Sequence, residues 1–159
     1  MSSFHFRDAA SSDGPAIRGV VFTVLEEYGL SPDPGTTDAD LQDVISSYTA
    51  RGGCFRVLVS PRHEIVGCGG LYPLAEDEAE IRKMYFLKDA RGRGLGRRLL
   101  LNLINAARER GFRRVVVETA SVLEDAIALY RQNGFVPLER AHLPRRCDQA
   151  YVLSLTTRQ

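Results

Sequence analysis

The spacing of apolar residues changes along the chain between a helical period and a strand period. In four segments apolar side chains recur every three or four positions, which predicts helices with one buried face. Short alternating or continuous apolar runs, bounded by glycine, proline or asparagine, predict strands. The expected helices span residues 15–28, 37–48, 95–110 and 122–132, and the expected strands span 4–7, 55–59, 64–71, 78–87, 114–118, 135–138 and 150–155.

The predicted order of elements is β-α-α-β-β-β-α-β-α-β-β. Consecutive strands next to a β-α-β unit predict an α/β (α+β) fold built on one mixed sheet with helices on both faces. The β-α-β unit spans residues 78–118, and its strands should be parallel neighbours joined by a right-handed crossover. A chain of 159 residues is long enough for one core, so we expect a single domain over residues 1–159.

Glycine and capping residues indicate where elements bend or begin. Gly67, Gly69 and Gly70 lie inside an expected strand, which indicates a β-bulge or a close approach of another backbone. Ser121 and Glu124 have the spacing of a capping box, which predicts that a helix starts there.

The segment from Arg91 to Arg98 combines three glycines with four arginines between an expected strand and the longest expected helix. Glycine lets the backbone approach a ligand closely, and the start of the helix offers unpaired N–H groups and a positive dipole end. Arginine adds charge and paired donors. This combination predicts a site for a phosphate or pyrophosphate, with a plain surface turn as the alternative.

The composition and spacing of the chain exclude several other functions. A dinucleotide fingerprint would need glycine at Arg97 or Leu99, and a P-loop would need a lysine after the glycines, so a generic nucleotide-phosphate domain is disfavoured. A net charge of +1 argues against a duplex-DNA binder. The odd, scattered Cys54, Cys68 and Cys147 predict neither a metal site nor a disulfide framework, and no base accompanies Cys147 as a nucleophile.

The N-terminal residues lack the apolar stretch of a signal peptide, and nowhere do 18 apolar residues follow one another. Together with the scattered cysteines, this indicates a cytoplasmic protein without a membrane span.

The remaining pattern, R-x-x-G-x-G, occurs as Arg91, Gly94 and Gly96 and resembles the acyl-CoA-binding signature of the GNAT N-acetyltransferase superfamily. Residues 80–86 are similar to the strand that precedes this signature in the family. Residues 126–135 are similar to its later A-x-x-L-Y-x-x-x-G-F motif. The resemblance covers nearly the whole chain and implies a mostly antiparallel sheet in which one parallel pair of strands splays apart around the co-substrate acetyl-CoA.

The resemblance also implies which residues bind acetyl-CoA. Backbone groups of the splayed strand would hold the pantetheine arm, at Met84, Tyr85 and Phe86. The signature arginine and the amides of the loop and helix start would hold the pyrophosphate. These residues are Arg91, Gly92, Arg93, Gly94, Leu95, Gly96 and Arg97. No metal is implied.

One position departs from the family pattern. Many relatives place an asparagine that contacts the cofactor near the start of the last helix, where this chain has Leu123. Ser121 and Asp125 are the neighbouring polar residues that could supply the contact instead.

For catalysis, the resemblance implies that Tyr130 protonates the departing thiolate and that Glu80 or Glu118 is the general base. A phenol with a pKa near 10 can donate a proton at neutral pH. Glu80 shares a strand face with Met84 and Phe86 if no bulge intervenes. The structural alternatives are a core tyrosine for Tyr130, a solvated hairpin end for Glu80, and a helix cap or arginine partner for Glu118.

The implied reaction is direct acetyl transfer from acetyl-CoA to a primary amine. The acceptor would contact residues 26–37 and 140–151, where Arg145 and Arg146 either hold the carboxylate of an amino-acid-like small molecule or belong to a solvated loop. Acetylation of a protein amine and a non-catalytic acyl-CoA sensor are the alternatives. Neither nucleic acid nor a membrane is expected as a partner, and a homodimer is compatible with the family.

Charge is distributed unevenly along the chain. Residues 1–90 carry a net charge of −6 and residues 91–159 a net charge of +7. The basic part begins at the expected pyrophosphate loop, as a polyanionic cofactor favours, and the acidic part holds much of the expected acceptor side, as a cationic amine favours. Nineteen of the 21 basic residues are arginine.

Overall fold

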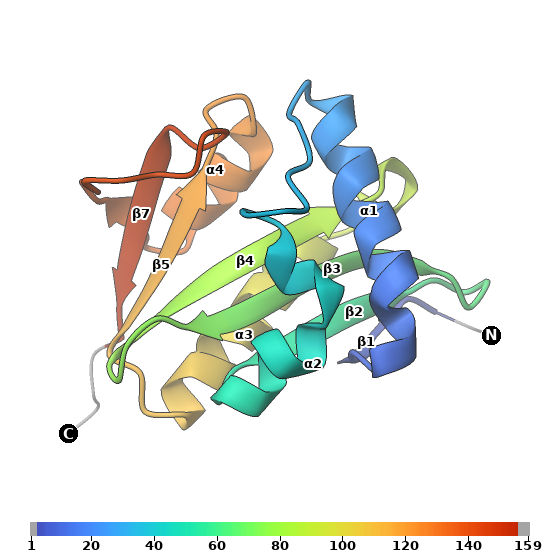
Figure 1. Cartoon of the computed structure of the whole chain (residues 1–159), viewed down its shortest axis with the longest axis horizontal. Coiled ribbons are helices and arrows are strands. Elements are labelled where there is room, and N and C mark those ends of the chain that lie inside the picture. Colours follow the sequence, from blue (N-terminus) through green and yellow to red (C-terminus); the bar gives the residue numbers. More distant parts are fainter. Residues whose placement is uncertain (1–2, 156–159) are drawn as a thin grey trace.

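A seven-stranded sheet in the order β1-β2-β3-β4-β5-β7-β6 forms the centre of this computed structural model, which describes residues 3–155 (Figure 1). Neighbouring strands are antiparallel except β4 and β5, which are parallel. The mixed, mostly antiparallel sheet is therefore confirmed. The strands are β1 (His5–Asp8), β2 (Cys54–Val59), β3 (Ile65–Pro73), β4 (Glu78–Phe86), β5 (Arg114–Thr119), β6 (Val136–Pro137) and β7 (Gln149–Ser154).

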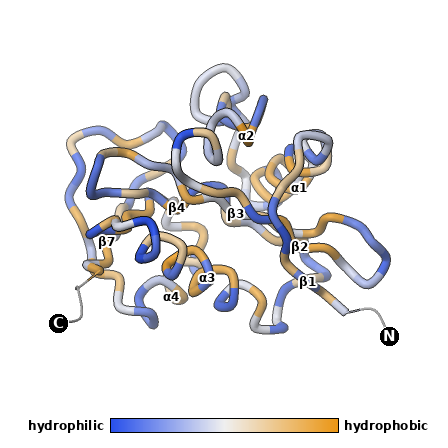
Figure 2. Tube along the Cα trace, turned by 90° about the horizontal axis from the view of Figure 1, so that it is seen from below, coloured by the Kyte–Doolittle hydropathy of each residue, from blue (hydrophilic) through white to orange (hydrophobic). Residues whose placement is uncertain are grey.

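Helices cover both faces of the sheet, as the sequence predicts. Figure 2 shows α1 and α2 on one side and α3 and α4 on the other. None of the helices in residues 3–155 combines the length and the apolar character needed to cross a lipid bilayer. The helices are α1 (Gly14–Glu27), α2 (Val44–Ser47), α3 (Leu95–Glu109) and α4 (Glu124–Gln132), with 3-10 turns η1 (Ser11–Asp13), η2 (Ala39–Gln42), η3 (Thr49–Arg51) and η4 (Lys88–Ala90).

The sheet separates two hydrophobic cores. Leu99 and Leu103 of α3 are fully buried in the core on one face. Ile17, Val21 and Leu25 of α1 are fully buried in the core on the other face. Burying a side chain of this size contributes roughly 1.5–3 kcal/mol, so these apolar stripes are what hold the helices against the sheet.

The continuous helix predicted over residues 37–48 is wrong. The segment contains η2 and α2, separated by Asp43 in an extended conformation. The Asp43 side chain accepts a hydrogen bond from the N–H of Ser46 at 3.1 Å and so caps α2. Asp38 and Asp40 instead direct their carboxylates to Lys83. Short polar side chains that form hydrogen bonds or ion pairs outside a helix can interrupt it. The helix is interrupted here even though apolar residues continue to recur at helical spacing.

The predicted capping box at Ser121 is also absent. α4 begins at Glu124, with Leu123 in the capping position and no side-chain cap. The hydroxyl and the N–H of Ser121 each donate to a carboxylate oxygen of Asp148, both at 2.8 Å. Ser121 therefore ties the start of α4 to the segment before β7. The other predicted elements are confirmed to within two residues at each end.

β3 and β4 meet at a β-bulge, as the glycines predict. The register between these strands shifts between Cys68 and Gly70. Over this stretch β4 has two residues, Lys83 and Met84, opposite the single residue Gly69. The backbone of Lys83 has a φ of 58°, in the left-handed region that residues other than glycine rarely occupy.

The bulge changes which side chains of β4 share a face. Met84 and Phe86 pack in the same core as Ile81. Glu80, which precedes Ile81, points to the opposite face. The expectation that Glu80 shares a face with Met84 and Phe86 required an unbroken strand, and the bulge overturns it.

Replacing Gly70 with alanine should destabilise the fold. A Cβ at Gly70 would lie 2.6 Å from the ring of Phe55 and 2.7 Å from the ring of Tyr48. Both rings are buried and packed edge to face, with centroids 5.0 Å apart, so they have little room to move. We expect Gly70→Ala to lower the free energy of unfolding by about 1–3 kcal/mol in urea titrations.

Gly19→Ala is the matched control. Gly19 lies on the exposed face of α1, and a Cβ there would meet nothing within 4 Å. Alanine is the better helix former, so this variant should gain roughly 0.5–1 kcal/mol. Equal stability of the two variants would contradict the packing argument.

Candidate active site

β4 and β5 pair over a short stretch and then separate. The paired positions are Glu78 with Arg114, Ala79 with Val115 and Glu80 with Val116. Beyond these positions β4 continues to Phe86 and β5 to Thr119, but the two strands do not pair with each other again within the described chain, and Figure 1 shows them diverging. The backbone groups of β4 on this side are therefore left for another partner, and the splayed parallel pair is confirmed.

A cavity of about 620 Å³ opens between the separated strands. Its size is typical of a site for a small molecule or cofactor. All but two of the predicted site residues line it, the exceptions being Arg93 and Arg97. The predicted residues that line the cavity are Glu80, Met84, Tyr85, Phe86, Arg91, Gly92, Gly94, Leu95, Gly96, Glu118 and Tyr130.

The glycine loop brings the start of α3 to the mouth of this cavity. Gly92 and Gly94 have φ values of 76° and 75°, a conformation that disfavours any side chain. Gly94 is the capping residue of α3 and carries no side chain to occupy the free N–H groups that follow. Because Gly94, Leu95 and Gly96 all line the cavity, the N-terminus of α3 offers it an anion site.

The arginines of the loop have different partners. The terminal nitrogens of Arg91 donate to both carboxylate oxygens of Glu27, at 2.7 and 2.8 Å, and its Nε donates to the carbonyl of Phe86 at 2.9 Å. The guanidinium of Arg93 lies 4.9 Å from the ring centroid of Phe4. Arg91 therefore clamps the end of α1 to the loop, in addition to lining the cavity.

Tyr130 is a buried residue of α4 whose ring packs against Phe135, with centroids 5.6 Å apart. No hydrogen-bond partner for its hydroxyl is found among residues 3–155, and the residue lines the cavity. Burial raises the pKa of the hydroxyl, and nearby Tyr85 and Cys147 raise it further. Tyr130 is therefore a protonated tyrosine in the wall of the cavity at neutral pH.

Glu80 and Glu118 approach each other from the two separating strands. The Glu80 carboxylate accepts a hydrogen bond from the Nε of Arg82 at 2.5 Å. Burial, followed by the nearby Glu80 carboxylate, raises the pKa of Glu118 to about 7, although the Arg140 guanidinium 3.7 Å away acts in the opposite direction. Glu118 therefore keeps its proton to a higher pH than an ordinary glutamate does.

Leu123 and Asp125 both line the cavity, whereas Ser121 is engaged with Asp148. Of the two polar residues that could replace the family asparagine, Asp125 is therefore the one that the structure places at the cavity.

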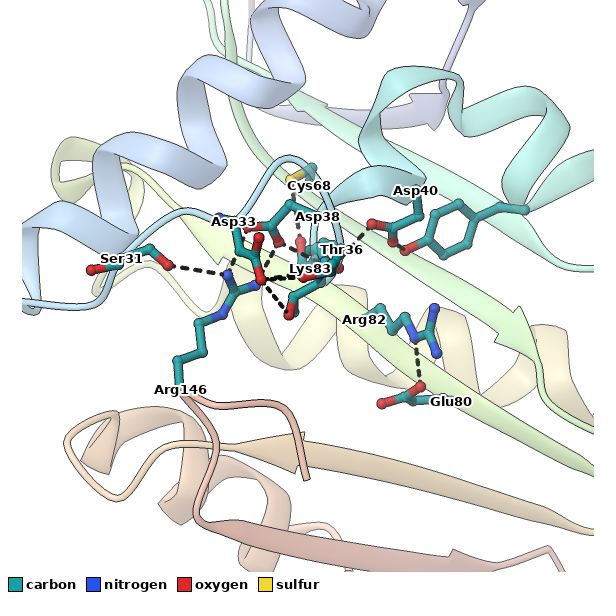
Figure 3. A network of polar contacts seen from close by, with 12 residues as sticks. Ser31, Asp33, Thr36, Asp38, Asp40, Cys68, Glu80, Arg82, Lys83 and Arg146 are labelled. Atoms are coloured by element: carbon teal, nitrogen blue, oxygen red, sulfur yellow. Dashed lines mark hydrogen bonds and ion pairs between the residues drawn. The ribbon is translucent and has the colours of Figure 1, made fainter. Parts of the chain in front are cut away.

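Arg146 is engaged with a buried aspartate, contrary to the expectation that it binds an acceptor. Its terminal nitrogens donate to the two carboxylate oxygens of Asp38, at 2.7 and 2.6 Å (Figure 3). Asp38 is fully buried and also lies 3.3 Å from the Nζ of Lys83. Arg145 is exposed and does not line the cavity.

Sequence reasoning did not identify Arg82 as a site residue and included it only in the strand motif of residues 80–86. Its side chain lines the cavity and pairs with Glu80. The signal was present in the alternation of the strand, since Arg82 is two residues from Glu80 and shares its face.

Cys147 lines the cavity as well, and burial raises the pKa of its thiol to about 11. The thiol is neutral at neutral pH, which does not suit a nucleophile. Within residues 3–155, no three His, Cys, Asp or Glu side chains are grouped so that they could bind a metal ion.

Two relatives with known sequences are similar to this chain. The uncharacterized N-acetyltransferase YjgM of Escherichia coli (strain K12) is 42% identical over 134 residues, which make up 81% of this chain and 80% of that protein. Human N-acetyltransferase 8 is 29% identical over 106 residues, which make up 63% of this chain and 46% of that protein.

Two solved structures share the fold. A GNAT-family acetyltransferase from Staphylococcus aureus Mu50 superposes with a TM-score of 0.90 at 22% identity, covering 97% of this chain and 100% of that one. YncA from Salmonella typhimurium, solved with its cofactor acetyl-CoA, superposes with a TM-score of 0.78 at 20% identity, covering 98% and 96% of the two chains.

A sequence model described as the acetyltransferase (GNAT) family matches residues 22–135, which include α3, β4, β5 and α4. Because this match spans well over half of the chain and YjgM matches most of its length, the chain belongs to the GNAT family of N-acetyltransferases, whose acetyl donor is acetyl-CoA.

Proposed function

We propose that this enzyme transfers the acetyl group of acetyl-CoA directly to the primary amine of a small molecule. The observation that carries the proposal is a single cavity that contains an anion-binding helix start, a protonated tyrosine and a pair of carboxylates. These are the groups needed to hold the donor, to protonate the leaving thiolate and to take a proton from the amine.

In this proposal acetyl-CoA binds along two parts of the chain. Its pyrophosphate lies at the N-terminus of α3, where the N–H groups of residues 92–97 and the helix dipole favour negative charge. Its pantetheine arm follows β4 at Met84–Phe86 and takes the place of the missing strand partner. A backbone N–H of this edge would polarise the thioester carbonyl.

Tyr130 and Glu118 then act on the two sides of the reacting centre. The amine nitrogen bonds to the carbonyl carbon, Glu118 takes a proton from the amine, and the C–S bond breaks as the thiolate receives the Tyr130 proton. A pKa of about 7 suits Glu118 as a base at neutral pH. Glu80 is the alternative base, but its carboxylate is paired with Arg82.

A contact between two loops on the acceptor side supports a small molecule rather than a protein amine. The Asp38–Arg146 ion pair joins the loop after α1 to the loop before β7 (Figure 3), and both residues are largely buried. A protein segment would need an open groove at this position. A non-catalytic acyl-CoA sensor would have no use for a carboxyl group that titrates near neutral pH beside a protonated tyrosine.

We also propose that the enzyme works in the cytoplasm as a single domain over residues 1–159. Cys54, Cys68 and Cys147 are all free thiols, as is typical of a reducing compartment. One sheet joins the N-terminal and C-terminal strands of the described chain, which supports a single folding unit.

Tyr130→Phe should lower kcat by about 10²- to 10⁴-fold, the range of a lost general acid, because the thiolate would leave without its proton. Acetyl-CoA affinity, measured by calorimetry, should change little, since the ring and its packing are kept. Tyr151→Phe is the control: its hydroxyl donates to Gln149 and lies outside the cavity. Full turnover by Tyr130→Phe would remove Tyr130 from the mechanism.

Glu118→Gln should remove one ionisation from the pH profile of kcat/KM for the amine. Glu118 is a base only when ionised, so in the wild type the profile should rise with pH through about 7, in addition to the rise caused by the amine itself. The variant should keep only the amine's rise and lose about 10²-fold or more in rate above pH 7.

Glu78→Gln is the matched control for this profile. Glu78 also pairs with Arg140 but does not line the cavity. A rise near pH 7 that survives Glu118→Gln would point to Glu80, and Glu80→Gln should then abolish it.

A further inference from the structure

A second cavity, of about 310 Å³, adjoins the main one. Thr36, Thr37 and Arg82 line both cavities, so Arg82 stands where they meet. The rest of its wall consists of Ala39, Asp40, Ser47 and the Tyr72 ring. This space lies beside Glu80 and away from the start of α3, and it therefore belongs to the acceptor side.

The guanidinium of Arg82 is held in a fixed orientation. It stacks on the ring of Tyr72 with its Cζ atom 3.8 Å from the ring centroid, and its Nε donates to Glu80. The side chain is 28% exposed. No hydrogen-bond partner for its terminal nitrogens Nη1 and Nη2 is found among the described residues. Their N–H groups are therefore available to a ligand.

The other cations that line the main cavity already have partners. Arg91 is bound by Glu27, and Arg146 is bound by Asp38. Lys83 donates to the carbonyl of Thr37 at 2.9 Å and lies 3.3 Å from Asp38. Within residues 3–155, Arg82 is thus the cavity-lining cation whose terminal nitrogens carry no protein hydrogen bond.

Building on the proposed acetyl transfer, we propose that Arg82 binds the carboxylate of an amino-acid acceptor through Nη1 and Nη2. The carboxylate would lie in the second cavity and the amine in the main cavity, near Glu80 and Glu118. Planar guanidinium and carboxylate groups match as a bidentate pair. An amino acid also carries its two charges close together, as the Glu80–Arg82 ion pair does, so each charge of the zwitterion meets its opposite.

Asp40 also lines the second cavity, but its charge is compensated within the protein. The hydroxyl of Tyr48 donates to one of its carboxylate oxygens, and the other lies 3.3 Å from the Nζ of Lys83. Asp40 therefore does not repel a bound carboxylate as an isolated anion would. The inference selects free amino acids over polyamines and protein N-termini, which lack a carboxylate beside the amine.

The test starts with the wild-type enzyme. Amino acids are screened with acetyl-CoA by the release of free thiol, and the best acceptor is compared with its carboxamide and with the amine that lacks the carboxyl group. We expect kcat/KM to fall about 10- to 100-fold for both analogues, as for the loss of a charge-assisted bidentate contact. This comparison needs no variant and is independent of folding.

Arg82→Gln should then lower kcat/KM for the amino acid by a similar factor, mainly through KM, and lower it much less for the carboxamide. The KM for acetyl-CoA should stay within about twofold, since Arg82 is not among the residues proposed to bind acetyl-CoA. Arg51→Gln is the matched control, because Arg51 lies 4.9 Å from the same Tyr72 ring but lines neither cavity. Thermal melting checks that both variants are folded.

The outcomes separate this inference from the proposed function. If the carboxamide, a polyamine or a peptide amine is acetylated as well as any amino acid, the inference is overturned while acetyl transfer to an amine stands. If acetyl-CoA binds but no amine releases thiol, the proposed function is overturned and the inference with it.

Discussion

Lys83 is a buried cation, and its need for partners organises one side of the molecule. A buried ammonium is unfavourable unless it is paired, because it has lost its hydration. Its partners here are the Asp38 and Asp40 carboxylates, each 3.3 Å from Nζ, and the Thr37 carbonyl. These contacts draw the segment after α1 across β4. Asp38 in turn binds Arg146, which brings in the segment before β7 (Figure 3).

The same lysine occupies the bulge that divides the site into two parts. Before the bulge, Glu80 and Arg82 share one face of β4 and line the main cavity. After it, Met84 and Phe86 face the core under α3 and lead to the glycine loop. An unbroken strand would have placed all four side chains on one face. The positive φ of Lys83 therefore turns the side chains before and after the bulge to opposite faces of the sheet.

The parts of the fold that could be predicted are those with a local cause. The stripe of α3 and the left-handed glycines of the loop depend on near neighbours, so spacing alone reveals them. The helix predicted over 37–48 is interrupted partly because Asp38 and Asp40 pair with Lys83, more than 40 positions away. Arg146 pairs with Asp38, which lies 108 positions before it. The glycines predicted a bulge, but nothing in a lysine predicts that it will occupy the left-handed position.

The raised pKa of Glu118 has a similar origin. On the sequence, Glu118 ends a buried strand, and that position alone suggested that the carboxyl group has a role. Its proximity to Glu80 follows from the short parallel pairing of β4 with β5, and its contact with Arg140 follows from the loop after β6. Sequence reasoning could therefore name both candidate bases but could not predict the surroundings of either.

The opposite net charges of the two halves of the chain have a use that sequence reasoning did not foresee. Several arginines after residue 90 pair with carboxylates before it: Arg91 with Glu27, Arg114 and Arg140 with Glu78, and Arg146 with Asp38. The more exposed pairs each add little stability, about 0–1 kcal/mol. The Asp38–Arg146 pair is buried, and its effect is on geometry, since it fixes which two loops meet beside the cavity.

This use of charge also accounts for part of the excess of arginine over lysine. Arg91 and Arg146 each donate two hydrogen bonds to one carboxylate, a geometry that the single ammonium of lysine cannot reproduce. Arg82 has the same planar group with its terminal nitrogens unbonded by the described residues, held flat on Tyr72 at the edge of the acceptor side. The guanidinium groups of Arg91 and Arg146 are paired with carboxylates of the protein. In our proposal, the guanidinium of Arg82, which lines both cavities, binds the carboxylate of the substrate.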